Sequence, residues 1–202
     1  MAAGMSPSPT RAAVFVLVLV GLVHALPVRS AAQKQKVQPG AQATAKQAPL
    51  AQYDIGRLPG PVLEMREAIL AAVRSGRIED LTTAIEMNEI KPTFLDGPQA
   101  DPIAQLKAVS ADREGREVLA AIANILDAGY VALPFGRDLE NNRIYVWPHF
   151  AETGVAGLSP PAEVELYRLV PFNGARRMLD SGRYDGWRIG IGADGVWHFL
   201  RR

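Results

Sequence analysis

The sequence contains no cysteine, and this absence excludes several kinds of chemistry. Without thiols the chain cannot form a disulfide framework, bind a metal through thiolates or use a cysteine as nucleophile. It also cannot be anchored as a lipoprotein, because that pathway acylates a cysteine after the signal has been removed. No cofactor motif replaces these, so we expect neither a cofactor nor a metal.

Positive charge is not in large excess either. The whole chain carries a formal charge of +1, but two of its basic residues lie in the first 32 residues, which hold no acid. Three lysines follow between residues 33 and 50, so residues 51–202 hold 17 basic against 21 acidic residues, a charge of −4. Proteins that bind nucleic acid carry a basic stripe that neutralises phosphates. We therefore expect no nucleic-acid partner.

The first residues have the layout of a secretory signal: Arg11, an apolar run over residues 12–23, and a tail of small residues. This run is shorter than the roughly 20 apolar residues that a membrane helix needs. We predict cleavage after Ala32 in preference to Ala25, which leaves a periplasmic or secreted protein without a stable membrane span. An uncleaved signal anchor is the alternative.

Residues 33–58 are rich in Gln, Ala, Pro and Lys. They hold too few large apolar side chains to offset the entropy lost on ordering, so we predict a disordered linker that acts as a spacer. A polybasic partner site is the alternative. Apolar periodicity begins at Pro59, and the remaining residues, 59–202, are enough for a single domain with one core.

The first half of this domain has helical periodicity. Apolar residues at helical spacing predict one helix after Pro59 that ends at Gly76 and a second from Ile78 to about Glu89, which together form an αα-hairpin. Asp101-Pro102 is typical of a helix start, with the aspartate as cap. The longest helix is predicted over residues 113–128, ending before Gly129, and should be the core helix.

The second half changes to alternating periodicity. The predicted elements are strands over 130–133 and 143–149, helices from Ser159 to about Val170 and over 175–179, and a terminal β-hairpin over 186–202 with its turn at Asp194-Gly195. These elements indicate an α+β fold. A helical N-terminal half, made of the αα-hairpin and the long core helix, packs on a small antiparallel sheet that ends in the C-terminal hairpin.

The hairpin contains a G-x-G-x-x-G pattern from Gly190 to Gly195, but a dinucleotide site needs a helix behind it, and only seven residues follow. Simple strand pairing predicts two faces. The core face holds Trp187, Ile189, Ile191, Val196, His198 and Leu200. The other face holds Arg188, Gly190, Gly192, Trp197, Phe199 and Arg201, so aromatic rings cover the glycines. A ligand-stacking surface flanked by Arg188 is the alternative for that face.

Histidine is scarce in the domain, with only His149 and His198. Tyr145, Trp147 and His149 alternate onto one face of their predicted strand, and Glu152 follows closely. An imidazole oriented by a carboxylate can act as a general base, so His149, Tyr145 and Glu152 are the candidate catalytic residues. Packing of these side chains is the alternative. His149, His198 and Glu152 could together bind a metal, but no ligand spacing supports such a site.

The residues Tyr145-Val146-Trp147-Pro148, together with the segment from Trp187 to Phe199, resemble a family of uncharacterised exported bacterial proteins. The resemblance covers roughly residues 60–202. It implies export and a single domain, and it transfers no catalytic residue.

The leading hypothesis is an exported protein of the cell envelope that acts as a non-catalytic binding or accessory module. It would bind an envelope protein or a cell-wall component through the aromatic residues Tyr145 and Trp147, or through Trp197 and Phe199 beside Arg188. The alternative is a small periplasmic hydrolase or lyase with His149 as general base. A folding factor with an exposed apolar patch is a third hypothesis. The pattern contains no signal for an oligomeric state.

Overall fold

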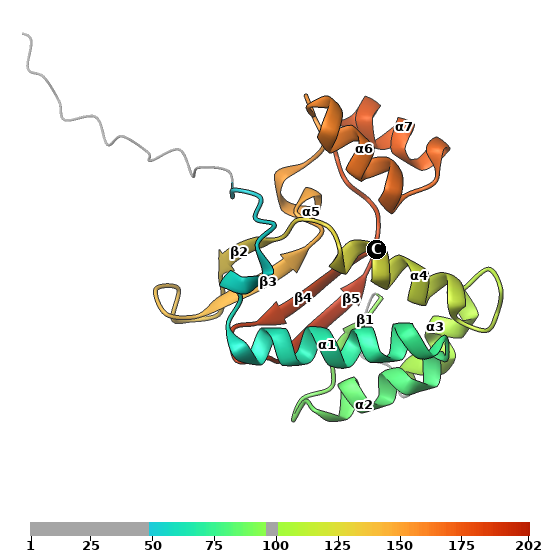
Figure 1. Cartoon of the computed structure of the whole chain (residues 1–202), viewed down its shortest axis with the longest axis vertical. Helices are drawn as coiled ribbons and strands as arrows, with labels where there is room; N and C mark the ends of the chain where they lie inside the picture. Colours follow the sequence, from blue (N-terminus) through green and yellow to red (C-terminus); the bar gives the residue numbers. More distant parts are fainter. Residues whose placement is uncertain (1–48, 96–100) are drawn as a thin grey trace, which may run out of the picture. The chain divides into compact units, whose positions relative to one another are not determined.

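The computed structural model describes residues 49–95 and 101–202. They form an α+β fold in which helices pack on a five-stranded sheet, as expected (Figure 1). The predicted signal peptide over 1–32 lies outside the described residues, as does most of the predicted linker. Within the two described ranges, no helix has the length and apolarity needed to cross a membrane.

The elements follow one another in chain order, helices first and the terminal hairpin last. The helices are α1 (Gly60–Ser75), α2 (Leu81–Glu86), α3 (Pro102–Val109), α4 (Arg116–Leu126), α5 (Phe150–Thr153), α6 (Pro160–Leu169) and α7 (Phe172–Ser181), with 3-10 turns η1 (Ile55–Arg57) and η2 (Ile78–Asp80). The strands are β1 (Thr93–Phe94), β2 (Val131–Pro134), β3 (Arg143–Trp147), β4 (Arg188–Gly192) and β5 (Trp197–Arg201).

The αα-hairpin is confirmed: α1 ends at Gly76, whose φ of 68° is easily adopted by glycine, and α2 packs back on α1. The prediction that the longest helix covers 113–128 is wrong. Helix α1 has 16 residues, whereas α4 has 11 and begins only at Arg116.

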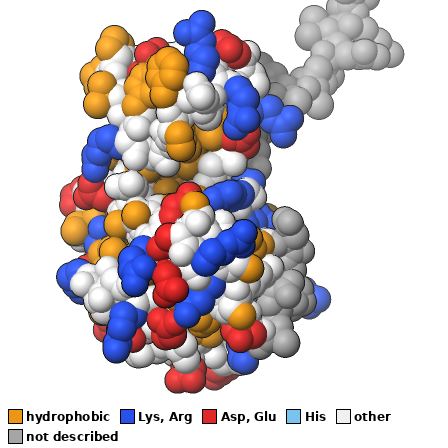
Figure 2. All heavy atoms as spheres, turned by 90° about the vertical axis from the view of Figure 1, so that its right-hand side faces the viewer, with side chains coloured by type: hydrophobic (Ala, Val, Ile, Leu, Met, Phe, Trp, Pro, Cys, Tyr) orange, Lys and Arg blue, Asp and Glu red, His pale blue; other side chains and the backbone are white. Residues whose placement is uncertain are grey.

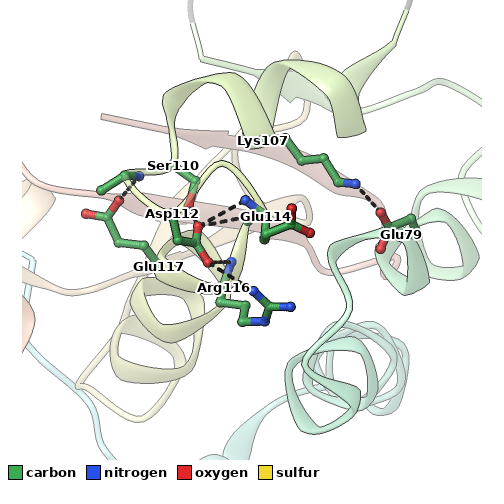
Figure 3. A network of polar contacts seen from close by, with 9 residues as sticks. Glu79, Lys107, Ser110, Asp112, Glu114, Arg116 and Glu117 are labelled. Carbon is green, nitrogen blue, oxygen red and sulfur yellow. Dashed lines mark hydrogen bonds and ion pairs between the residues drawn. The ribbon is translucent and has the colours of Figure 1, made fainter.

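The late start of α4 has a local cause. The Asp112 carboxylate accepts hydrogen bonds from the backbone N–H groups of Glu114, Gly115 and Arg116, and from the Ser110 hydroxyl (Figure 3). These bonds hold residues 110–115 in a turn that competes with helix. Lys107 of α3 forms an ion pair with Glu79 of η2 (Figure 3).

The predicted caps of two other helices differ in outcome. The Asp101 side chain accepts a hydrogen bond from the backbone N–H of Ala104 at 2.9 Å, which confirms it as the cap of α3. Ser159 occupies the corresponding position of α6, but its side chain makes no capping hydrogen bond. Proline at the first position of α6 removes one N–H group that would otherwise need a partner.

The sheet has the order β1-β5-β4-β3-β2 and is mixed, so the prediction of a purely antiparallel sheet is wrong. The exception is β1, which runs parallel to β5 and places Phe94 opposite Leu200. Two residues show no alternation in the sequence, so nothing in the pattern indicated this strand. The Phe94 ring is buried against Trp197, with ring centroids 5.1 Å apart, and this packing favours the pairing.

The main core lies between the sheet and helices α1 and α4. Its fully buried side chains include Val62, Ile69, Ile78, Leu81, Leu106, Ile122, Tyr130, Trp147, Ile189, Ile191, Trp197 and Leu200. We call the described residues outside 150–186 the main body, and residues 150–186, which hold α5, α6 and α7, the C-terminal lobe. The lobe has a smaller core of its own, made of Phe150, Val155, Leu166, Ala175, Met178 and Tyr184.

The terminal hairpin is confirmed, but its predicted faces are only partly right. Gly190 pairs with Phe199, whereas the next residue, Ile191, pairs with Trp197, so His198 is an extra residue at a β-bulge. The bulge moves Trp197 onto the core face and His198 onto the other face, where its ring lies 4.7 Å from Phe135. Strand pairing without a bulge predicted the reverse for both.

The linker boundary also needs correction, because the described domain begins before Pro59. Gln52 and Tyr130 exchange two backbone hydrogen bonds of 2.7 and 2.8 Å. Leu58 is 5% exposed and belongs to the main core. Composition alone assigned residues 51–58 to the disordered linker, because Leu58 is the one buried apolar side chain in this stretch.

Candidate functional site

Three of the residues proposed to contact a partner lie in the core. Trp147 and Trp197 are fully buried, and Tyr145 is 9% exposed. The Trp147 ring packs against Tyr130 with centroids 5.2 Å apart. The alternation of Tyr145 and Trp147 on one strand face was detected correctly, but that face is covered by the helices. These side chains therefore offer no surface to a partner.

Phe199 and Arg188 lie on the opposite face of the sheet and are partly exposed. The Phe199 ring covers Gly190 closely: a Cβ at Gly190 would lie 2.4 Å from the ring, which confirms the predicted cover of this glycine. The Arg201 guanidinium stacks on the same ring, 4.5 Å from its centroid. Phe199 is the only aromatic residue of the predicted stacking surface that lies on this face, and its ring is already covered by intramolecular contacts.

The sequence pattern placed His149 in a strand, and this prediction is wrong. His149 is the N-cap residue of α5 and lies outside β3. Strand β3 ends at Trp147, because Pro148 has no N–H group with which to extend the ladder. His149 is 6% exposed, and both ring nitrogens are engaged. Nδ1 lies 3.1 Å from the Thr153 hydroxyl, and Nε2 lies 3.3 Å from the Tyr53 hydroxyl.

The carboxylate near His149 belongs to Glu165 of α6, at 3.6 Å from Nε2. Glu152, the predicted partner, is exposed and makes only a backbone contact with His149. Glu165 also accepts hydrogen bonds from the Tyr53 hydroxyl and from the backbone N–H of Gly129, both at 2.8 Å. A segment near residue 53, a loop at residue 129 and two helical segments therefore meet at one cluster.

The cluster shifts the acidity of two of its members. Burial alone would raise the pKa of Glu165, but hydrogen bonds from His149, Gly129 and Tyr53 outweigh it and lower that pKa below its usual value. Burial of the Tyr53 hydroxyl, its hydrogen bond to Glu165 and the charge of that carboxylate raise the pKa of Tyr53 to about 12. At neutral pH the cluster therefore holds an ionised Glu165 and a neutral Tyr53.

Two members of the cluster, Tyr53 and Glu165, line a hollow of about 390 Å³. A general base must reach the reacting atoms, and His149, which is 6% exposed, is not among the residues that line this hollow. Tyr145 is not among the polar partners of His149. Sequence reasoning missed Tyr53, which lies 96 residues from His149 along the chain, and Glu165, which belongs to a different helix. The one available signal was a glutamate on the polar side of a predicted helix.

His198 and His149 do not share a site. His198 lies at the bulge of β5, where burial lowers its pKa and the charge of Asp194 partly opposes that shift. No group of three or more histidine, aspartate or glutamate side chains within 49–95 and 101–202 is placed to hold a metal ion. The metal site considered from His149, His198 and Glu152 does not form.

A hollow of about 610 Å³ lies between α4 of the main body and α6–α7 of the lobe. Figure 2 looks onto this side and shows the hollow beneath the lobe, with basic and acidic side chains beside it. Its walls combine apolar side chains with three arginines and two acids. The charged and aromatic lining residues are Glu117, Arg168, Arg177, Asp185, Trp187 and Arg202. We call this the arginine hollow.

The residues of the arginine hollow come from four separate segments, so no local motif marked it in the sequence. Asn124 and Ala120 are exposed positions of α4, and Arg177 is an exposed position of α7. Trp187 precedes β4, and its backbone carbonyl accepts a hydrogen bond from Tyr184 at 2.9 Å. The hollow contains no serine, histidine or tyrosine. Its lining offers three cations, two carboxylates and an aromatic ring.

Comparisons of the chain with models of protein families, with curated proteins and with solved structures find no match. The resemblance to exported bacterial proteins therefore stays a prediction.

Proposed function

We propose that the chain is an exported accessory protein of the cell envelope that binds a partner in the arginine hollow and catalyses no reaction. The observation that carries this proposal is the composition of the hollow: three arginines and a tryptophan beside an apolar wall, with no serine, histidine or tyrosine among the lining residues. The hollow takes the place of the aromatic surfaces predicted from the sequence, which are largely buried.

Two further features support a binding role over a hydrolase or lyase. The imidazole of His149 is 6% exposed and contacts Tyr53, Thr153 and Glu165, so little of the group expected to act as general base is open to a substrate. The volume of the arginine hollow lies within the roughly 300–1,000 Å³ range of ligand sites. Export itself rests on the predicted signal in residues 1–32.

The first experiment tests export. The full chain is expressed with its own N-terminus, and the mass of the protein is measured in periplasmic, secreted and cytosolic fractions. We expect a mature protein that begins at Gln33 outside the cytosol. An intact chain that stays in the cytosol would contradict the envelope role, whatever the hollow binds.

The second experiment tests the binding surface by filling it. Ala120 is exposed on α4 and lines the hollow, so Ala120→Trp should block the hollow without disturbing the core. The matched control is Ala71→Trp, at an exposed position of α1 that lines no described hollow. Capture of partners from envelope extract should fall with Ala120→Trp and persist with Ala71→Trp. Equal capture by both variants would move the binding surface elsewhere.

A further inference from the structure

The arginines in and near the lobe differ in whether they already form an ion pair with a carboxylate. Arg168 pairs with Asp127 at 2.5 Å, and Arg176 pairs with Asp180 at 3.6 Å. Arg177 and Arg202, which both line the arginine hollow, have no ion-pair partner among the described residues. Two guanidinium groups of the hollow are therefore free to bind an anion.

One of these guanidinium groups is already oriented. The guanidinium of Arg202 lies over the ring of Trp187, 4.5 Å from its centroid. A stacked guanidinium keeps its N–H edge directed sideways, which suits two parallel hydrogen bonds to a carboxylate. Stacking also occupies one face of Trp187, so that ring face is not free to stack on a sugar.

The wall beside the arginines is apolar. It is formed by Ala120 and Ala121 of α4, by Leu169 and Val170 at the end of α6, and by Met178 of α7. An apolar group bound next to the carboxylate would be removed from water against this wall. Glu117 and Asp185 lie at the same hollow and can pair with N–H groups of the ligand.

We propose that the arginine hollow binds the free carboxyl terminus of a peptide whose last side chain is small and apolar. This inference rests on the proposed binding role of the hollow and names the chemistry of its ligand. The carboxylate lies between Arg177 and Arg202, the last side chain contacts the apolar wall, and the acids receive backbone N–H groups. A long aliphatic acid fits less well, because the hollow is open and lined by five charged side chains.

The experiment measures binding of the acetylated tripeptide Ala-Ala-Ala to the mature chain by NMR titration, as the free acid and as the C-terminal amide. A hydrogen bond to a charged group is worth about 1.5–3 kcal/mol, so we expect the amide to bind at least about tenfold more weakly. Binding of the acid should also weaken as salt rises from 0.05 to 0.5 M, roughly in line with screening.

Two variants test the assignment of the arginines. The double variant Arg177→Gln with Arg202→Gln should lose at least about tenfold in affinity for the free acid. The matched control is Arg176→Gln, next to Arg177 but outside the hollow and paired with Asp180, and it should change affinity less than about twofold. Circular dichroism confirms that the variants are folded.

Each other result overturns the inference in a different way. Equal binding of acid and amide, blocked by Ala120→Trp, would exclude carboxylate recognition and leave the hollow as a binding site. Equal affinity of the double variant and the native chain would place the peptide elsewhere. If neither peptide binds at millimolar concentration, the ligand class is wrong, whereas capture from envelope extract then decides the proposed function independently.

Discussion

The main body and the C-terminal lobe bury their side chains to different extents. In the main body, helices α1 and α4 cover one face of the sheet and enclose large side chains such as Trp147 and Trp197 completely (Figure 1). The lobe has only six buried core residues and leaves Val164 62%, Tyr167 42% and Phe172 67% exposed. Because less apolar area is removed from water, we expect the lobe to open before the main body.

This difference bears on the proposed function, because the arginine hollow has one wall on each part. Its α4 wall belongs to the well-packed main body, whereas Arg177 and Met178 belong to the lobe. Displacement of the lobe would change the width of the hollow. A binding site with one rigid and one adjustable wall can accommodate ligands of somewhat different length.

The largest expected effect tests the packing of the main body. Trp147→Ala removes a fully buried indole and should lower the free energy of unfolding by about 3–5 kcal/mol, measured by urea denaturation. The matched substitution in the lobe, Phe172→Ala, removes an exposed ring and should change the free energy of unfolding by less than about 0.5 kcal/mol. Similar losses for both would remove the contrast between the two parts.

A smaller effect is expected where Phe199 covers β4. Gly190→Ala places a methyl group 2.4 Å from the Phe199 ring and 3.0 Å from Ile144, and should cost about 1–3 kcal/mol of stability as the ring is displaced. Gly60→Ala is the control, because no atom lies within 4 Å of the added carbon at this helical position. We expect it to stabilise the protein by about 0.5 kcal/mol. An unchanged thermal midpoint for Gly190→Ala would show that the ring moves freely.

The Glu165 cluster, which joins the lobe to the segment near Tyr53, should make stability dependent on pH. Because the pKa of Glu165 is lowered by folding, its contribution is present above the usual glutamate pKa, about 4.3, and is lost as pH falls through the lowered value. Glu165→Gln should therefore cost about 1 kcal/mol at pH 7 and almost nothing in acid, measured by urea midpoints from pH 7 to 3. A constant difference would exclude ionisation as the cause.

Tyr53 should act at the opposite end of the pH scale. Its pKa is raised to about 12, so its contribution is complete below its ordinary pKa, about 10, and is lost as pH rises through the raised value. Limited proteolysis between pH 9 and 12 should detect release of the segment at residues 49–58. Tyr53→Phe should abolish this pH dependence, whereas Tyr167→Phe, at an exposed position of the lobe, should retain it.

The smallest effect concerns the ion pair between Arg168 of α6 and Asp127 after α4. Both side chains are more than half exposed, at 54% and 67%, so Arg168→Gln should change stability by less than about 0.5 kcal/mol. The change should disappear in 1 M salt, where screening is nearly complete. A larger loss that persists in high salt would mean that this contact holds the lobe in place.

Much of the fold could be predicted from the sequence, because periodicity over many residues reports which face is buried. The stripe of α1, the cap of α3 at Asp101 and the turn at Gly195 are local signals, and the structure contains each of them. Errors arose where one residue changed the outcome. The bulge at His198 reverses the faces of β5, and an alternating pattern contains no mark of an inserted residue.

The candidate site was less accessible to prediction. Trp147 and Tyr145 were selected as exposed aromatics, yet aromatic residues on a strand look the same in sequence whether a helix or solvent covers them. Of the partners of His149, Tyr53 lies 96 residues before it along the chain, and Glu165 belongs to a different helix. The pattern of a single sequence contains no signal for contacts between such separate elements.

The sequence by itself determined the class of fold, the order of its longer helices and strands and the absence of thiol chemistry, since these follow from local propensity, periodicity and composition. Only the tertiary structure decided which aromatic residues are buried, which carboxylate meets His149, and that arginines from the lobe and the chain end line one hollow. The physical reason is that packing joins segments distant in sequence, and the free energy of burial depends on what covers a side chain rather than on its neighbours in the chain.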